Sequence, residues 1–343
     1  MIWLTWRQFR VQALAGGGAL ALLAIVLGVT GPDLADDYAS GLATCGDAED
    51  CERFAESFFA DHQPAFLGLL AIVLLTPALV GLFWGAPLIA REVEAGTHRL
   101  VWNQSVTRTR WLAVKLAVTG SVAMLLTGLA AFAVDWWAEP LDEAAGLEAA
   151  RMTPLMFDGR GIAPMGYAAF AFTLGVAVGL LTRRTLAAMA VTLAVFAVVQ
   201  IAMPLVVRER LLPPTNVTTE ITRANLGGFM SRGPGMPIKL TVKPDDPGAW
   251  MLTNETVDRS GKVVDTVPMK MGVGPCTEQR APGPPGPAAE CLAEIKRLGY
   301  RQKLVYHGSD RFWPLQWAET GVYAVLSLGL AGFCFYRIRR NLS

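Results

Sequence analysis

The chain has few charged residues and long runs with no charge at all. Only 17% of its 343 residues are Asp, Glu, Lys or Arg, whereas 52% are hydrophobic. A soluble domain contains nearer a quarter of charged residues, and uncharged apolar runs of about 20 residues are typical of membrane spans. The formal net charge of +1 gives no indication of nucleic-acid binding. The composition therefore indicates a membrane protein.

The sequence also lacks the motifs of nucleotide binding and of common hydrolytic enzymes. It contains no Gly-x-x-x-x-Gly-Lys-Ser/Thr phosphate loop, no His-Glu-x-x-His and no Gly-x-Ser-x-Gly. Its histidines, His62, His98 and His307, are far apart in the sequence, which argues against a metal centre. Acids within the apolar runs, such as Asp135 and Glu319, lie near the ends of the runs. Ion-driven transporters usually carry ionisable groups at mid-membrane, so energy for any transport would enter from elsewhere.

Six apolar runs are long enough to cross a bilayer, for which a helix needs about 20 residues. They cover 11–30, 64–90, 111–137, 163–182, 186–207 and 319–336. The first run follows two arginines, as in a secretory signal peptide, but no small-x-small cleavage pattern follows Thr30, so we interpret it as a retained helix. The short sequence TRRT at 182–185 predicts a tight antiparallel hairpin of the fourth and fifth helices. We therefore predict an all-α polytopic membrane protein with six transmembrane helices.

The distribution of charge between the runs predicts their orientation. Basic residues gather near one set of span ends: Arg7, Arg10, Arg91, Arg99, Arg108, Arg110, Arg183, Arg184, Arg337, Arg339 and Arg340. On the other side, the loop 31–63 contains Arg53 as its single basic residue among many acids, and 138–162 is also acidic. Because cytoplasmic loops carry the excess of Lys and Arg, both termini are predicted to be cytoplasmic and the segment 208–317 extracellular.

The segment 208–317 is long enough to form a domain between the fifth and sixth helices. Stretches rich in Thr and Val, separated by turn residues, predict short strands, and one amphipathic stretch that ends at Gly299 predicts a helix. The strands are expected at 239–242, 250–257 and 262–267, and the helix within the stretch 290–301, where Gly299 ends it. We expect a small α+β domain that covers the extracellular mouth of the membrane part.

Four of the five cysteines lie on the predicted outer side. Cys45 and Cys51 are in the first loop and Cys276 and Cys291 in the large segment, whereas Cys334 is inside the last span. An oxidising environment favours disulfides, and proximity in sequence favours Cys45–Cys51 and Cys276–Cys291. Four cysteines allow three connectivities, and free thiols remain the alternative.

Two polar stretches on the predicted inner side have two possible interpretations each. Residues 1–12 (MIWLTWRQFRVQ) place aromatic residues at a spacing of three, which suits a short helix in the membrane interface; alternatively, this basic start only sets the orientation. Residues 91–110 (REVEAGTHRLVWNQSVTRTR) are either a topological anchor between two spans or a contact surface for another protein. The residues themselves favour neither interpretation of 91–110.

Residues 86–116, APLIAREVEAGTHRLVWNQSVTRTRWLAVKL, resemble the loop between the second and third spans of ABC-2-type permeases, in particular actinobacterial ABC transporter permease subunits. The resemblance extends to WLTWRQFRVQ at 3–12 and to DRFWPLQWAETGVYAVLSLGLAGFCFYRIRRNL at 310–342. It implies the six-span fold of ABC-2 or type V exporters. The implied domains are an interfacial connecting helix at 1–12, helices 1–5 with a coupling loop (91–110) at 13–207, an extracellular domain at 208–317, and helix 6 with a cytoplasmic tail at 318–343.

The resemblance also implies partners and a contact surface. A homodimer, or a pair of close relatives, would bind two copies of a separate ATP-binding subunit, and ATP and Mg would be held there, with no cofactor in this chain. The coupling segment would dock on that subunit. Its implied contact residues are Glu92, Glu94, Gly96, Thr97, Arg99, Leu100, Val101, Trp102, Asn103 and Gln104.

The predicted function is therefore that of the permease subunit of an ATP-driven transporter in a bacterial cell membrane. The apolar spans suit efflux of amphiphilic small molecules, lipids or peptides. Candidate pathway residues are Phe83, Trp84, Phe196 and Gln200, for which packing or lipid contact is the alternative. The large outer segment departs from compact drug exporters of the family. The alternative function is a non-transporting sensor or assembly protein whose outer domain binds a ligand or partner, and a membrane enzyme is a weaker third hypothesis.

Overall fold

The computed structural model describes residues 2–96, 107–144, 151–231, 236–270, 276 and 289–341. Contacts divide the chain into two compact units. The helical unit comprises Met1–Ala149, Pro154–Leu211 and Phe312–Ser343, and the sheet unit comprises Ala150–Thr153 and Leu212–Arg311. The boundaries differ from the predicted domain 208–317 because Arg208 and the residues after Phe312 belong to the helical unit.

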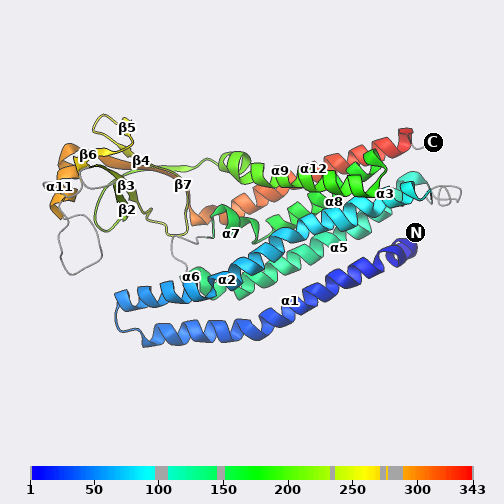
Figure 1. The fold of residues 1–343 in the computed structure, drawn as a ribbon, viewed down its shortest axis with the longest axis horizontal. Coiled ribbons are helices and arrows are strands. Elements are labelled where there is room, and N and C mark those ends of the chain that lie inside the picture. The colour runs from blue at the N-terminus through cyan, green and yellow to red at the C-terminus, as the bar shows by residue number, and fades with distance from the viewer. Residues whose placement is uncertain are drawn as a thin grey trace. The chain divides into compact units, whose positions relative to one another are not determined.

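The described helical unit consists of long helices interrupted by two π-helical turns, η1 and η2 (Figure 1). The elements are α1 (Ile2–Thr44), α2 (Ala48–Val80), η1 (Gly81–Gly85), α3 (Ala86–Glu94), α5 (Arg108–Trp137), α6 (Glu139–Ala144), α7 (Pro154–Asp158), α8 (Ala163–Thr182), α9 (Thr185–Ala202), η2 (Met203–Val207), α10 (Arg208–Leu211) and α12 (Phe312–Asn341).

Six helical segments of the described chain are long and apolar enough to cross a membrane, as the sequence predicted. They are Thr5–Thr44, Glu49–Glu94, Arg108–Trp137, Ala163–Thr182, Thr185–Leu211 and Ser309–Arg340. The fourth has the predicted bounds, and a two-residue turn at Arg183 and Arg184 joins it to the fifth. Arg183 adopts a left-handed backbone conformation with φ of 53°, which ends α8. The predicted tight hairpin is thus present.

The predicted loop at 31–63 is a helical hairpin instead. α1 continues to Thr44 and α2 begins at Ala48, and Asp47 caps α2 by accepting a hydrogen bond from the backbone N–H of Asp50 at 2.9 Å. The two extensions bury Leu34, Tyr38 and Phe58 in a shared apolar cluster, and this packing stabilises helices whose exposed faces carry the acids. The charges had suggested a loop because the buried stripe between them is narrow.

The N-terminal stretch is also part of a longer helix. Residues 2–12 continue without a break into the rest of α1, so the predicted connecting helix is not a separate element. Phe9 is buried and its ring packs edge-on against Trp84, with centroids 4.8 Å apart. Of the aromatic residues at a spacing of three, Phe9 packs the start of α1 on η1.

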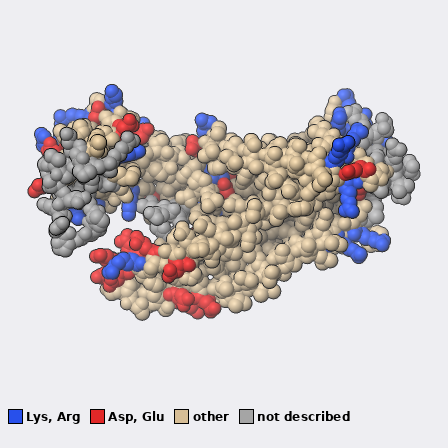
Figure 2. Space-filling view, viewed as in Figure 1, with Lys and Arg blue, Asp and Glu red and all other residues tan. Residues whose placement is uncertain are grey.

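Charge is sorted along the helical unit (Figure 2). Lys and Arg gather at the end that holds the start of α1, the end of α3 and the end of α12, whereas Asp and Glu gather at the α1–α2 connection. The surface between these ends carries almost no charge in this view. This pattern is the one expected of helices that cross a bilayer together.

The sheet unit contains, among the described residues, two antiparallel sheets and one helix. One sheet has the order β1–β7–β4–β5 and the other β2–β3–β6. The strands are β1 (Thr215–Glu220), β2 (Leu226–Ser231), β3 (Pro237–Val242), β4 (Trp250–Val257), β5 (Val263–Val264), β6 (Val267–Lys270) and β7 (Arg301–His307), and the helix is α11 (Ala289–Leu298). The predicted strand 250–257 matches β4, and the predicted helix ends at Gly299, whose φ is +85°.

The core of the sheet unit joins both sheets and α11. Alternate residues of β3 and β7 point inward, as a half-buried strand requires, and α11 contributes Cys291, Leu292 and Ile295. The buried amide of Gln302 on β7 donates to the carbonyl of Leu240 on β3 at 3.2 Å and to the side chain of Asn254 at 2.6 Å. This buried polar network links the two sheets.

Both predicted cysteine pairs are disulfides in the structure. Cys45 pairs with Cys51 at the α1–α2 connection, and Cys276 pairs with Cys291 at the start of α11, with Cα atoms 5.2 and 4.6 Å apart. Cys334 is buried and free within α12. The first disulfide closes the connection of the helical hairpin, and the second ties Cys276 to the core of the sheet unit.

Candidate functional site

The first part of the predicted coupling segment is the end of α3. Glu92 and Glu94 lie in its last turn, and Gly96 follows with φ of +69°, a conformation that favours glycine and ends the helix. The other predicted contact residues lie outside the described residues: Thr97, Arg99, Leu100, Val101, Trp102, Asn103 and Gln104. The structure therefore shows how this segment is attached to the helices that precede it.

Glu92 attaches α3 to α5 through a buried ion pair with Lys115. The Lys115 side chain is only 4% exposed, and its Nζ lies over the ring of Trp111, 4.8 Å from the centroid. A buried ammonium group is stable only when it is paired. The pair thus fixes the end of α3 against the first turns of α5.

Glu94 attaches α3 to α9. Its carboxylate accepts hydrogen bonds from the backbone N–H of Thr185 at 3.0 Å and from the Thr185 hydroxyl at 2.8 Å. Thr185 is the first residue of α9, and Arg184 provides no side-chain cap. An anionic group at a helix N-terminus accepts hydrogen bonds from the free N–H groups there and interacts favourably with the positive end of the helix dipole. Glu94 therefore caps the helix that leaves the α8–α9 hairpin.

Glycines bring α8 into backbone contact with η1 and α3. A Cβ at Gly85 would lie 2.5 Å from the carbonyl oxygen of Phe172, and Cβ atoms at Gly175 and Gly179 would lie 2.6 Å from backbone atoms of Ala86. Gly81 also faces Ala171 of α8. Both pairs, 81/85 and 175/179, have the Gly-x-x-x-Gly spacing that allows helices in membranes to approach closely. α3 and α8 are therefore in direct backbone contact along these glycines.

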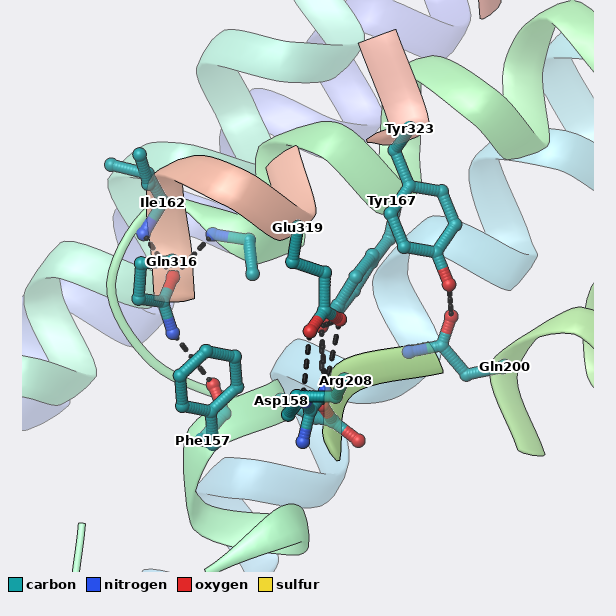
Figure 3. Close-up of polar contacts among 10 residues, drawn as sticks. Phe157, Asp158, Ile162, Tyr167, Gln200, Arg208, Gln316, Glu319 and Tyr323 are labelled. Carbon is teal, nitrogen blue, oxygen red and sulfur yellow. Dashed lines mark hydrogen bonds and ion pairs between the residues drawn. The ribbon is translucent and has the colours of Figure 1, made fainter. Parts of the chain in front are cut away.

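A buried polar cluster lies at the opposite end of the helical unit (Figure 3). Arg208 and Glu319 are both fully buried; Arg208 donates from Nε to Oε2 at 2.6 Å and from Nη2 to Oε1 at 2.9 Å. Arg208 also pairs with Asp158. The Tyr167 hydroxyl is 2.6 Å from Glu319 and 3.1 Å from Asp158, so it can donate to either carboxylate. These contacts join α7, α8, α10 and α12.

The π-helical turn η2 directly precedes Arg208. η2 contains Pro204 near its start and is followed directly by Arg208 at the start of α10. Proline removes one backbone donor, and π-helical turns insert a residue into a helix, often at functional sites.

Burial raises the pKa of Asp158 to about 6, although the neighbouring Arg208 opposes this rise. The cluster therefore holds two carboxylates against one guanidinium.

A second arginine has the same arrangement nearby. Arg160, 1% exposed, donates from Nε to Asp135 at 2.6 Å and from Nη2 to Asp142 at 2.8 Å. Gln316 of α12 accepts from the backbone N–H groups of Ile162 and Ala163 at 3.0 and 2.7 Å, and so caps α8 (Figure 3). Together with the first cluster, these contacts form a polar clamp, which we define as Asp135, Asp142, Asp158, Arg160, Tyr167, Arg208, Gln316 and Glu319.

Sequence reasoning missed the polar clamp. Arg208 was the first polar residue after an apolar run, and Asp135 and Glu319 were noted only as acids near span ends. Asp135 and its partner Arg160 are 25 residues apart in the chain, and Arg208 and Glu319 are 111 residues apart. An available signal was that Arg160 and Arg208, like Arg53, lie on the side of the predicted membrane whose short loops are rich in acids.

The four predicted pathway residues do not line one common site within this chain. Trp84 faces Phe9 of α1, and Phe83 beside it is half exposed. Phe196 is buried near Phe170 of α8, with ring centroids 6.4 Å apart, and Gln200 accepts a hydrogen bond from the Tyr323 hydroxyl at 3.3 Å. Among the described residues, these four side chains thus contact two different parts of the unit.

Comparison with known proteins identifies the family. The model of the family described as ABC-2 membrane transporter related matches residues 17–208, more than half of the chain. No curated protein and no solved structure matches. Permeases of this kind are membrane subunits of transporters and normally work with an ATP-binding subunit. With six apolar helices among its described residues, the chain is a multi-pass membrane protein and belongs to the ABC-2 membrane transporter related family.

Proposed function

We propose that this chain is the permease subunit of an ATP-driven exporter. Two permease chains, identical or closely related, would bind two copies of a separate ATP-binding subunit, which would hold ATP and Mg. The family match supports this proposal, and so does the attachment of α3. Glu92 and Glu94 connect the end of α3 to α5 and to the α8–α9 hairpin.

Coupling would act through residues 92–104. The ATP-binding subunit would contact the segment that begins at Glu92, and a displacement there would reach α5 through Lys115 and α9 through Thr185. α8 would follow because its glycines touch the backbone of η1 and α3. One contact surface could therefore move four helices, which is what alternating access requires of a permease without its own energy source.

The proposed orientation has both termini in the cytoplasm and the sheet unit outside a bacterial cell. The gathering of Lys and Arg at the end with α3 and the ends of α1 and α12 supports it (Figure 2). The two disulfides also support it, because disulfides persist on the oxidising side of the membrane.

The cargo is proposed to be amphiphilic, such as a lipid, a peptide or a greasy small molecule. The spans expose large apolar side chains and few charges, which suits a cargo that reaches the protein through the bilayer. The sheet unit would then contact the cargo on release or a partner in the cell envelope.

The decisive test is assembly with an ATP-binding subunit. Arg99→Glu combined with Trp102→Asp should abolish co-purification of that subunit while the permease still inserts. The control is the single variant Arg223→Glu, which changes an exposed arginine in the sheet unit and keeps Arg99 and Trp102. It should bind the ATP-binding subunit normally. A wild-type chain that purifies without any ATPase subunit would instead support the sensor or assembly function.

A further inference from the structure

Three adjoining cavities follow α1 along the helical unit. Their volumes are about 470, 510 and 600 Å³. Trp84 lines both the first and the second cavity, and Val26, Leu69 and Ile72 line both the second and the third. The three cavities therefore adjoin one another along α1, with the side chain of Trp84 between the first and the second, and together we call them the α1 groove.

Along residues 16–26 the α1 groove lies between α1 and α2 while α1 rests on α5, and further along the chain α1 and α2 pack on each other at Leu34, Tyr38 and Phe58. Glycines mark the close approaches: a Cβ at Gly16 would lie 3.0 Å from Leu126, and a Cβ at Gly31 would lie 2.9 Å from Trp136. Between these points α1 and α2 form two walls, and Leu126 and Ala130 of α5 form the floor. Much of α1 is exposed along this length.

The middle of the groove is apolar and has the length of one bilayer leaflet. Of the side chains that line it, Thr76 is the one polar side chain among the described residues. Its α1 wall runs from Gly16 to Val26, about 15 Å at 1.5 Å per residue. That is about half of the roughly 30 Å hydrocarbon core of a bilayer. A hydrocarbon chain therefore fits this part of the groove.

The two ends of the groove have opposite charge. At the α3 end, Glu92 is paired with Lys115, and Arg91 adds one positive charge, so the lining carries a net +1. The amide of Gln12 also lines this end and donates to the carbonyl of Phe83 at 3.2 Å. At the far end the lining includes Asp33 and Asp37. An anionic headgroup is attracted to the first end and repelled by the second.

We propose that the α1 groove binds one amphiphile with a hydrocarbon chain and an anionic headgroup. The chain lies between α1 and α2, and the headgroup lies beside Arg91. This proposal does not depend on transport, because the same chemistry describes a resident membrane lipid and a cargo molecule.

Binding is tested by native mass spectrometry of the full chain in neutral detergent. The probes are phosphatidylglycerol and phosphatidylcholine with identical acyl chains. Ala19→Trp fills the groove and should weaken phosphatidylglycerol binding about tenfold, because displacing about two methylene groups is sufficient for that loss. Ala194→Trp, an exposed alanine on α9, is the matched control and should bind like the wild type.

Headgroup recognition is tested with Arg91→Gln. The substitution should weaken phosphatidylglycerol binding about fivefold, the effect of one basic residue near an anionic lipid, and should leave phosphatidylcholine binding unchanged. Arg184→Gln, at the same end of the unit, is the control and should leave the difference between the two lipids intact.

Three results would overturn the proposal. The first is equal binding of both lipids by the wild type. The second is an equal loss of phosphatidylglycerol binding in Ala19→Trp and Ala194→Trp. The third is a loss of permease dimers in Ala19→Trp with unchanged lipid binding, because a second copy of the chain would then cover the groove. In the assembled transporter, ATP turnover that empties the groove identifies a cargo, and unchanged occupancy identifies a resident lipid. Loss of ATPase assembly would refute only the proposed function.

Discussion

The two ends of the helical unit both contain buried ion pairs, but they arrange them differently. At the α3 end, one cation, Lys115, pairs with Glu92, and Glu94 caps α9 from an exposed position. At the other end, Arg160 and Arg208 each contact two carboxylates, and Gln316 caps α8. The polar clamp joins helix ends through several buried contacts, whereas α3 is held by two contacts, as the proposed coupling role of α3 requires.

The largest expected effect comes from breaking the polar clamp at Arg208. Arg208→Met leaves Asp158 and Glu319 buried without their guanidinium, and removing one partner of such a pair costs about 3–5 kcal/mol. The free energy of unfolding in detergent should fall accordingly. Arg210→Met, two residues away and exposed, is the control. Similar stabilities of the two variants would show that the clamp does not fix these helix ends.

A smaller effect is expected from the backbone contact between α8 and η1. Gly85→Ala places a Cβ 2.5 Å from a carbonyl oxygen of α8. Such overpacking lowers the free energy of unfolding by about 1–3 kcal/mol. Gly18→Ala, where a Cβ meets nothing within 4 Å, should leave thermal unfolding unchanged or raise its midpoint. An equal response of both variants would mean that α3 and α8 are not rigidly joined.

The smallest expected effect is a pH dependence at the polar clamp. Because the pKa of Asp158 is raised from 3.8 to about 6 in the folded protein, the folded state binds more protons than the unfolded state between these values. Its free energy of unfolding should therefore fall as pH rises from 5 to 7, by about 1 kcal/mol. Chemical unfolding at both pH values measures this change.

Asp158→Asn is the control for that pH dependence. The asparagine does not titrate, so its stability should differ less between pH 5 and pH 7 than that of the wild type. If the two proteins respond equally to pH, the dependence arises from other groups, and the clamp contributes nothing to it.

The sequence predicted the parts of the fold that depend on local pattern. The six spans, the hairpin at Arg183 and Arg184, and strand β4 follow from runs of apolar or alternating residues. The helical hairpin of α1 and α2 beyond Thr30 was missed, because its helices are stabilised by packing on each other beneath many acids.

The candidate site was less predictable. The resemblance predicted Glu92 and Glu94 as contacts for an ATP-binding subunit, and their partners within the chain, Lys115 and Thr185, come from other helices. Some pairs of the polar clamp are more than 100 residues apart, such as Arg208 and Glu319, and others, such as Arg160 and Asp135, are 25 apart, so no helical spacing predicts them. The close packing of α8 on η1 and α3 could not be predicted, because the sequence does not show which glycines face the neighbouring helix.

The central claim, that α3 transmits the action of an ATP-binding subunit, is tested most directly by Glu94→Ala in the reconstituted complex. This variant keeps residues 97–104 intact but loses the contact with Thr185. We predict that assembly with the ATP-binding subunit persists through residues 97–104 and that permease-dependent ATP turnover is clearly lost, whereas the control Glu139→Ala, at the other end of the unit, keeps both. Wild-type turnover in Glu94→Ala would contradict the claim.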